Sequence, residues 1–340
     1  MRRGSRRCGG LSMQRRALLA LGLGAAGFSL AGRSHAAQLG TFKVGVLQSG
    51  TENWELDVIK PHALDEREGI TLEVQPFGGN EAADVALMGD AVDAIVEDWL
   101  WVSRQRNDGV PVTWIPYSSN IGALMVKPDS PVKALADLKG RKVGIAGGAL
   151  DKGWLMLLAY GRDKAGIDLA QDAEPLFGAP PLLTEKLRSG ELDAVLNYWH
   201  FCARLEAEGY VRLLEGGAVQ EAFGVPASTP QLGYTFKEEM GQRSPGLVEA
   251  FARASREAKR IMKTSDEEWQ RLKPVTRAGS DAVEDAFMRR YREGIVERWG
   301  EAERKAAADL YLVVARLGGE KLVGRGQILA PGTFWPNVSF

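Results

Sequence analysis

Two spacings of apolar residues alternate along the chain beyond residue 38, and they predict a repeated succession of strands and helices. Short apolar runs predict buried strands at 41–47, 70–76, 91–96 and 110–116. Apolar residues three or four positions apart predict helices at 54–67 and 81–88. This β-α-β-α-β order is typical of a mainly parallel sheet that is flanked by helices.

The same succession starts again beyond residue 121. Strands are predicted at 122–127, 141–146 and 192–196, and helices at 132–138, 152–164 and 182–188. A loop is expected to begin at Phe177. Beyond Pro226 the pattern is mostly helical, with amphipathic segments at 246–262, 281–299 and 301–317. We therefore expect two α/β lobes and a group of C-terminal helices that packs on the first lobe.

Two segments of these lobes repeat one another without a gap. They are GDAVDAIVEDWLW at 89–101 and SGELDAVLNYWHF at 189–201. Identical residues stand at Asp93 and Asp193, at Ala94 and Ala194, and at Trp99 and Trp199. The shared part predicts a tight corner followed by a buried strand in each lobe, and the differing polar residues follow that strand.

The first 36 residues have the pattern of an export signal. Arg15 and Arg16 precede an apolar run at 17–30, which is shorter than the about 20 residues that span a bilayer. Small residues then favour cleavage before Ala37. The arginine pair resembles a twin-arginine signal, and the Sec route remains an alternative. Translation starts at Met1 or at Met13.

Removal of this segment changes the charge balance. Residues 1–36 hold seven arginines and no acidic residue, so 36 basic and 44 acidic residues remain, a net charge of −8. This balance argues against a nucleic-acid partner. Cys202 is then the remaining cysteine, which excludes an intrachain disulfide. We expect a periplasmic monomer that does not span the membrane and carries no cofactor.

Three stretches resemble type II periplasmic solute-binding proteins of ABC transporters. They are VKPDSPVKALADLKGRKVGIAGG (126–148), EKLRSGELDAVLNYW (185–199) and PGTFW (331–335). The similar branch is the nitrate/sulfonate/taurine group, which includes binders of thiamine-related pyrimidines. The resemblance implies a two-lobed α/β fold in which each lobe is a mainly parallel sheet flanked by helices. It also implies a small-molecule ligand in the cleft between the lobes and an ABC permease as partner.

The predicted strands and helices divide into two lobes. Lobe 1 would comprise residues 38–120 and 217–340, and lobe 2 would comprise residues 121–216. The chain would cross between the lobes near 118–121 and again near 217–228. Closure of two lobes around a ligand is a hinge motion that a few residues at such crossings absorb.

The ligand site is predicted where polar residues follow the strands, because ligands bind at the carboxyl ends of the strands in such sheets. Other candidates lie at the first crossing and at the helix that begins near residue 152. The predicted ligand-binding residues are Gln48, Ser49, Gly50, Trp54, Asp98, Trp99, Ser118, Ser119, Asn120, Gly148, Lys152, Trp154, Asn197, Tyr198 and Trp199.

Each group also has a structural interpretation. Trp99 and Trp199 could instead cap the core of each lobe, and the turn at 48–50 could be merely solvated. The residues at 118–120 could serve only as hydrogen-bonding groups of the hinge. Lys152 could be a solvated surface residue.

The predicted lining favours a neutral or cationic organic ligand, which could be heteroaromatic. Tryptophan faces attract flat rings and cations, and Glu97 and Asp98 would repel an anion. The backbone N–H groups at Gly148 and the Lys152 side chain favour an anion instead. No arginine stands at the predicted cleft edges, although Arg104 or Arg204 could reach them, so we favour a neutral or cationic ligand over nitrate or an alkyl sulfonate. The sequence contains no spaced set of metal ligands.

Two functions compete with transport. An enzyme resembling thiamine-pyrimidine synthases would need a cluster of histidines or cysteines, and beyond the signal the chain has only His62, His200 and Cys202. The other alternative is a periplasmic partner protein of a quinoprotein dehydrogenase. We predict a non-enzymatic solute-binding protein.

Overall fold

The described part of the chain forms two five-stranded sheets of the same design. The computed structural model describes residues 38–340, apart from the side chains of four residues between 317 and 322, so the expected export signal lies outside the described residues. The first sheet has the order β2-β1-β3-β10-β4. Its strands are β1 (Gly40–Leu47), β2 (Ile70–Phe77), β3 (Ala94–Asp98), β4 (Val112–Ser118) and β10 (Leu232–Lys237).

The second sheet repeats this arrangement with the order β7-β6-β8-β5-β9. Its strands are β5 (Ala123–Val126), β6 (Lys142–Ala146), β7 (Glu174–Gly178), β8 (Ala194–Asn197) and β9 (Val211–Glu215). In each sheet one strand, β10 or β5, is antiparallel to both of its neighbours, and the other four share one direction. The strands β3 and β8 therefore occupy equivalent places at the centre of each sheet.

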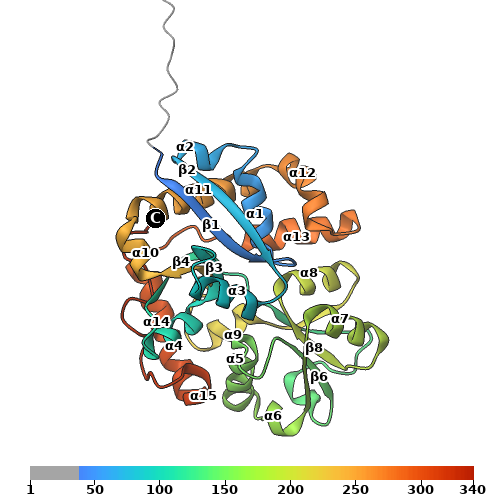
Figure 1. Cartoon of the computed structure of the whole chain (residues 1–340). Helices are drawn as coiled ribbons and strands as arrows, with labels where there is room; N and C mark the ends of the chain where they lie inside the picture. The colour runs from blue at the N-terminus through green and yellow to red at the C-terminus, as the bar shows by residue number, and fades with distance from the viewer. Residues whose placement is uncertain (1–37) are drawn as a thin grey trace, which may run out of the picture. The chain divides into compact units, whose positions relative to one another are not determined.

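Helices flank both sheets, as Figure 1 shows. Those between the strands are α1 (Glu52–Ile59), α2 (Leu64–Arg67), α3 (Asn80–Met88), α4 (Trp99–Asn107), α5 (Lys152–Tyr160), α6 (Leu169–Asp172), α7 (Pro180–Ser189), α8 (Trp199–Ala207) and α9 (Gly216–Ala222). The C-terminal ones are α10 (Glu238–Arg243), α11 (Pro245–Thr264), α12 (Asp266–Thr276), α13 (Asp281–Glu293), α14 (Glu301–Gly318) and α15 (Glu320–Val323). Two short irregular helices are η1 (Leu135–Leu138) and η2 (Gly161–Ala165). No helix among the described residues is long and apolar enough to cross a membrane.

The repeated segments fold into the same corner in both sheets. The Asp93 carboxylate accepts a hydrogen bond from the Lys43 N–H at 2.8 Å, and the Asp93 N–H donates to the Lys43 carbonyl at 2.8 Å. Asp193 makes the same pair of bonds with Lys142, both at 2.9 Å. Each aspartate thus ties the start of a central strand to the neighbouring parallel strand. The repeat predicted from the sequence is an architectural repeat.

Several predicted elements differ from the structure. The helix expected over 54–67 is two helices, because Pro61 interrupts it and Ala63 adopts a left-handed conformation with φ of 50°. The loop expected from Phe177 lies partly in β7, which pairs with β6. The region beyond Pro226, expected to be mostly helical, also contributes β10 to the centre of the first sheet.

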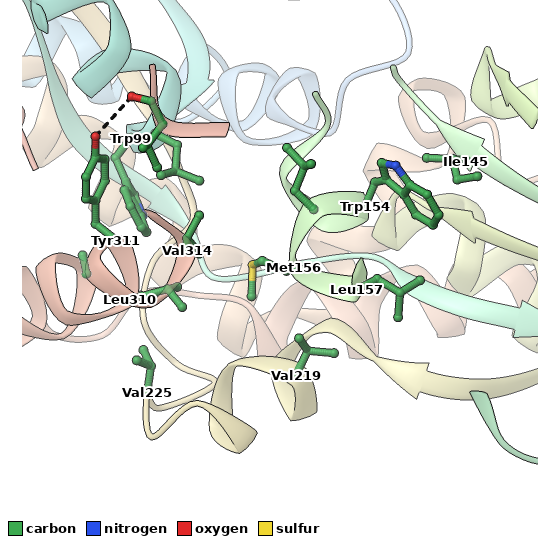
Figure 2. Packing of buried hydrophobic residues seen from close by; sticks show 14 of the residues in the cluster. Trp99, Ile145, Trp154, Met156, Leu157, Val219, Val225, Leu310, Tyr311 and Val314 are labelled. Carbon is green, nitrogen blue, oxygen red and sulfur yellow. Dashed lines mark hydrogen bonds between the residues drawn. The ribbon is translucent and has the colours of Figure 1, made fainter. Parts of the chain in front are cut away.

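The sequence suggested that the C-terminal helices pack on the first lobe, but in the structure they do not pack on the first sheet alone. α14 packs against α5, which follows β6 of the second sheet. Figure 2 shows part of the shared apolar core, with Trp154 and Met156 of α5 and Leu310 and Val314 of α14. This core therefore includes residues that follow both sheets.

The chain passes between the sheets twice. It leaves the first sheet after Ser118 and enters the second at Ala123, and it returns between Glu215 and Leu232. The first passage is tight, because a Cβ atom at Gly122 would lie 1.7 Å from the backbone oxygen of Asn197. A residue without a side chain is required at this point.

Candidate functional site

A cavity of about 210 Å³ lies among residues that follow strands of both sheets. Apolar side chains from Leu47, Val96, Met156, Leu196 and Leu214 line part of its wall. Ionisable side chains line the rest, from Glu52, Glu97, Asp98, Asp151, Lys152, Tyr198 and His200. Most of these residues stand at the ends of strands or in the first turns of the helices that follow them. The cavity thus lies at the carboxyl ends of the strands, where the sequence predicts the ligand site.

The structure brings some of the predicted site residues together and leaves others elsewhere. Those that line the cavity are Gly50, Asp98, Asn120, Lys152, Asn197, Tyr198 and Trp199. Those outside its lining are Gln48, Ser49, Trp54, Trp99, Ser118, Ser119, Gly148 and Trp154. Gln48, Ser49 and Gly148 are exposed in turns.

Three of the predicted tryptophans belong to the core instead. Trp99 is fully buried, and its indole N–H donates to the carbonyl of Pro230 at 2.9 Å. Trp154 is buried in the same apolar cluster. Trp54 lies in another cluster, where its ring packs edge-on against Trp199 at 5.6 Å between centroids. Large aromatic side chains bury much apolar area, and this explains their place in the core.

The serines of the first crossing act on the backbone rather than on the cavity. The hydroxyls of Ser118 and Ser119 lie 3.4 and 3.3 Å from the carbonyl of Gly294 and donate to it. Asn120 lines the cavity, but its amide donates to the carbonyl of Arg290 at 2.9 Å. These bonds fasten the crossing to α13 and to the residue that follows it.

Asn197 and Tyr198 have different roles, although both line the cavity. The Asn197 amide donates to the hydroxyl of Thr184 at 3.0 Å, and its side-chain oxygen accepts from the Tyr198 N–H at 2.8 Å. Its polar atoms therefore hold the corner together. Burial and the charges of Asp151 and Glu97 raise the pKa of the Tyr198 phenol, so this hydroxyl remains a hydrogen-bond donor at neutral pH.

Carboxyl groups dominate the charge of the wall. Burial raises the pKa of Glu52 to about 7, although its carboxylate accepts a hydrogen bond from the Leu47 N–H at 3.0 Å. Burial, and next the charge of Asp98, raise the pKa of Glu97 well above its usual range. Burial raises the pKa of Asp151 to about 6, against the hydrogen bond from the Trp154 N–H. The cavity therefore holds carboxyl groups that are poised to change protonation near neutral pH.

Lys152 is buried against this acidic wall, and is not the solvated surface residue that the sequence allowed as an alternative. Lys152 has a relative exposure of 8%. The ammonium donates to the carbonyl of Gln231 at 3.2 Å. Burial lowers its pKa, while Asp98, Asp151 and Glu97 act in the opposite direction.

Glu52, Asp151 and His200 were not predicted as site residues. Asp151 caps the N-terminus of α5 and Glu52 is the first residue of α1, so acidic residues at predicted helix starts were the available signal. Burial, and next the charge of Arg204, lower the pKa of His200 to about 3, so its ring is neutral. Both ring nitrogens are buried and have no hydrogen-bond partner within residues 38–340. Among residues 38–340 no group of three or more His, Cys, Asp or Glu side chains could hold a metal ion.

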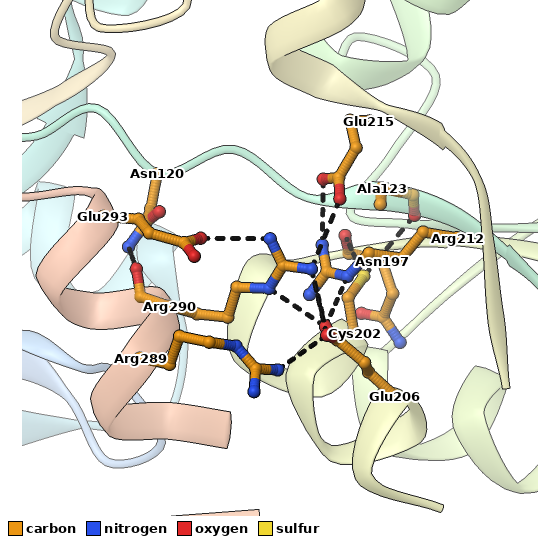
Figure 3. Close-up of polar contacts among 10 residues, drawn as sticks. All are labelled: Asn120, Ala123, Asn197, Cys202, Glu206, Arg212, Glu215, Arg289, Arg290 and Glu293. Carbon is orange, nitrogen blue, oxygen red and sulfur yellow. Dashed lines mark hydrogen bonds and ion pairs between the residues drawn. The ribbon is translucent and has the colours of Figure 1, made fainter. Parts of the chain in front are cut away.

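An ion cluster connects α8 of the second-sheet region to α13, beside the first crossing (Figure 3). The Glu206 carboxylate accepts hydrogen bonds from Arg212 at 2.7 Å, Arg289 at 2.7 Å and Arg290 at 3.0 Å. Burial raises the pKa of Glu206, but Arg212 and Arg290 outweigh it, so that the pKa is lowered. One carboxylate thus joins three guanidinium groups from two elements.

We expect Glu206→Gln to lower the free energy of unfolding by about 1–3 kcal/mol, because charge-assisted bonds are lost together. Since the folded pKa is lowered, the contribution is present above the unfolded pKa and declines as the pH falls through the folded one. Urea titrations at pH 7 and pH 3 measure both effects. The matched control is Glu293→Gln. Among the described residues the half-exposed Glu293 carboxylate pairs with Arg290 alone, so this change should alter stability by less than about 1 kcal/mol. Equal losses in the two variants would contradict the cluster's role.

Comparisons with known proteins agree with this architecture. The family model described as NMT1/THI5 like matches residues 66–268, which is more than half of the chain. No curated protein sequence matches the chain. Similar folds occur among solved structures.

The alkanesulfonate-binding protein SsuA from Xanthomonas axonopodis pv. citri, bound to MOPS, superposes with a TM-score of 0.69. It is 17% identical and the match covers 88% of this chain and 100% of that one. The periplasmic aliphatic sulphonate binding protein SsuA from Escherichia coli gives a TM-score of 0.64 at 18% identity, with 85% and 97% covered. The nitrate-binding protein NrtA from Synechocystis PCC 6803 gives 0.53 at 17% identity, with 70% and 66% covered. The fold is the two-lobed type II periplasmic-binding-protein fold.

Proposed function

We propose, because this chain belongs to the NMT1/THI5-like family, that it is the solute-binding component of an ABC-type import system. It would capture a small organic molecule in the periplasm and deliver it to a permease. The export signal over residues 1–36 would place it there. Lobe 1 would comprise residues 38–120 and 217–340, and lobe 2 would comprise residues 121–216.

The observation that carries this proposal is the cavity between the two sheets. Its wall contains Glu52, which follows β1, and Asp98, the last residue of β3, both from the first sheet. It also contains Asp151 and Tyr198, which follow strands of the second sheet. A ligand held by groups from both lobes favours the arrangement in which they lie together, so binding would shift the population towards it. The volume suits a molecule smaller than typical drug-sized ligands, whose pockets measure about 300–1,000 Å³.

The positions, pKa values and hydrogen bonding of the histidine and cysteine side chains support binding rather than catalysis. His62 lies 3.1 Å from Glu268, and neither residue lines the cavity. Burial raises the pKa of the Cys202 thiol to about 11, which disfavours the nucleophilic thiolate. His200 has no hydrogen-bond partner that could orient it as a general base. No observation favours the role of a partner protein for a quinoprotein dehydrogenase.

The experiment combines a thermal-shift screen with small-angle X-ray scattering on the purified protein. The screen covers amines, aminopyrimidines, sulfonates and nitrate, and a compound at 100 times its Kd should stabilise the fold by about 2.7 kcal/mol. Saturation with that compound should reduce the radius of gyration. An unchanged scattering curve at saturation would contradict capture between two lobes.

A further inference from the structure

The cavity wall contains more acidic than basic side chains. Its wall carries the carboxyl groups of Glu52, Glu97, Asp98 and Asp151. Among the described residues, Lys152 is the single Lys or Arg that lines the cavity, and the charge of Arg104, outside the lining, also acts on Glu97. Even with Lys152 fully protonated, one ammonium neutralises one of the four carboxyl groups. The net charge of the cavity lining is therefore negative whenever more than one of these carboxyl groups is ionised.

The carboxyl groups also lie close enough to act on common neighbours. Asp98, Asp151 and Glu97 all act on the charge of Lys152, and the same three act on the phenol of Tyr198. A Cβ atom placed on Gly147 would lie 3.0 Å from the Tyr198 hydroxyl and 3.1 Å from an Asp151 oxygen, so these two groups meet at one point. The acidic groups of both sheets thus converge on one region of the cavity.

Aromatic and apolar groups form the remainder of the wall. Trp199 lines the cavity, and the adjacent His200 ring packs edge-on against it at 5.7 Å between centroids. Tryptophan, tyrosine and carboxylate groups together suit a cation that carries an apolar skeleton. Desolvation strengthens this preference, because charges interact more strongly away from bulk water.

We propose that the cavity binds an organic monocation, an ammonium or amidinium whose charged group lies among Glu97, Asp98 and Asp151. This inference rests on the proposed solute-binding function and names the ligand class of that site. Whichever of these carboxyl groups is ionised would repel a sulfonate or nitrate ion. The sulfonate- and nitrate-binding proteins of similar fold would then differ from this chain in the charge of the ligand.

Proton release should accompany this binding. The cation favours the ionised form of each carboxyl group, so it lowers pKa values that burial has raised, to about 7 for Glu52 and about 6 for Asp151. The groups that face them from neighbouring elements are Glu55, Asp98, Lys152, Tyr198 and the neutral His200. Affinity for a cation should therefore rise from pH 5 to pH 8, by up to about tenfold per pH unit for each proton released.

The test uses three probes of nearly equal shape on the purified protein, namely benzylammonium, benzyl alcohol and phenylmethanesulfonate. Isothermal titration in two buffers of different ionisation enthalpy measures both affinity and proton release. We expect benzylammonium to bind at least about tenfold more tightly than the alcohol, and the sulfonate to bind less tightly than either. Small molecules released from the protein by denaturation are assigned a charge at pH 7 by electrophoresis, and we expect a cation.

Variants locate the effect. Glu97→Gln and Asp98→Asn should each weaken binding of the cation about 10- to 100-fold, because each removes a charge-assisted contact. The bound cation favours the ionised form of Glu97, although burial raises the pKa of this residue. Thermal unfolding of each variant checks that it folds. Glu267→Gln, at an exposed residue of α12, is the matched control and should leave affinity unchanged.

The outcomes separate this inference from the proposed function. A released or preferentially bound anion overturns the cation inference and leaves the solute-binding function standing. Failure of all three probes to bind, with no molecule released, overturns both. Preference for benzylammonium that survives loss of both carboxylates also overturns the inference.

Discussion

Lys259→Met is expected to lower the free energy of unfolding by about 3–5 kcal/mol, which is the usual consequence of removing one partner of a buried ion pair. The Lys259 ammonium pairs with the Glu55 carboxylate, and the two residues are 5% and 0% exposed. The same carboxylate accepts hydrogen bonds from the hydroxyls of Tyr234 at 3.0 Å and Tyr291 at 3.3 Å. Without Lys259 this carboxylate would have no positive partner among the described residues, in an apolar surrounding. Urea denaturation at pH 7 measures the loss of stability.

A double variant separates the lost ion pair from lost packing. Lys259→Met combined with Glu55→Gln removes both charges, so it should be more stable than Lys259→Met alone. The pair lies in the apolar cluster around α1 and α11 rather than in the cavity wall. Equal destabilisation in the single and double variants would show that the charge of Glu55 is not the cause.

The second large effect is expected at the first crossing between the sheets. Gly122→Ala places a Cβ atom 1.7 Å from the backbone oxygen of Asn197, and a backbone atom cannot rotate away as a side chain can. β5 and β8 must then separate locally, which should lower the unfolding free energy by about 1–3 kcal/mol. Tyr198 and Trp199 would move with β8, so ligand affinity should fall at least about tenfold. Urea denaturation and calorimetric titration measure the two effects.

Gly78→Ala provides the control for the change of residue type. Gly78 is exposed, and a Cβ atom there would meet no other atom within 4 Å. Its replacement should leave both stability and affinity nearly unchanged. If the two alanine variants behave alike, the close approach at Gly122 does not limit the crossing.

The sequence predicts the architecture well because its signals are local. The matched segments at 89–101 and 189–201 form equivalent strands, β3 and β8, with the same aspartate corner. The strand β10 was missed because its place is decided by pairing with β3 and β4, more than 100 residues earlier in the chain. Such pairing leaves no trace in the periodicity of the strand itself.

The candidate site was less predictable, for physical reasons. Position after a strand correctly indicates the part of the fold where Asp98 and Tyr198 lie, but it does not say which side chains turn inward. The side chains of Trp99 and Trp154 pack in the apolar core and do not line the cavity. Glu52 and Asp151 reach the wall from helix starts, and their polarity there resembles that of ordinary helix caps.

Native mass spectrometry shows whether the cavity between the two sheets holds a small organic molecule. The comparison is between the wild-type protein and Leu214→Trp, which fills the cavity from β9. Circular dichroism confirms that the variant is folded. We predict a bound small-molecule mass on the wild-type protein that is absent from the variant. A mass that both proteins retain equally, or no bound mass on the wild-type protein after exposure to periplasmic extract, would show that this cavity is not a solute-binding site.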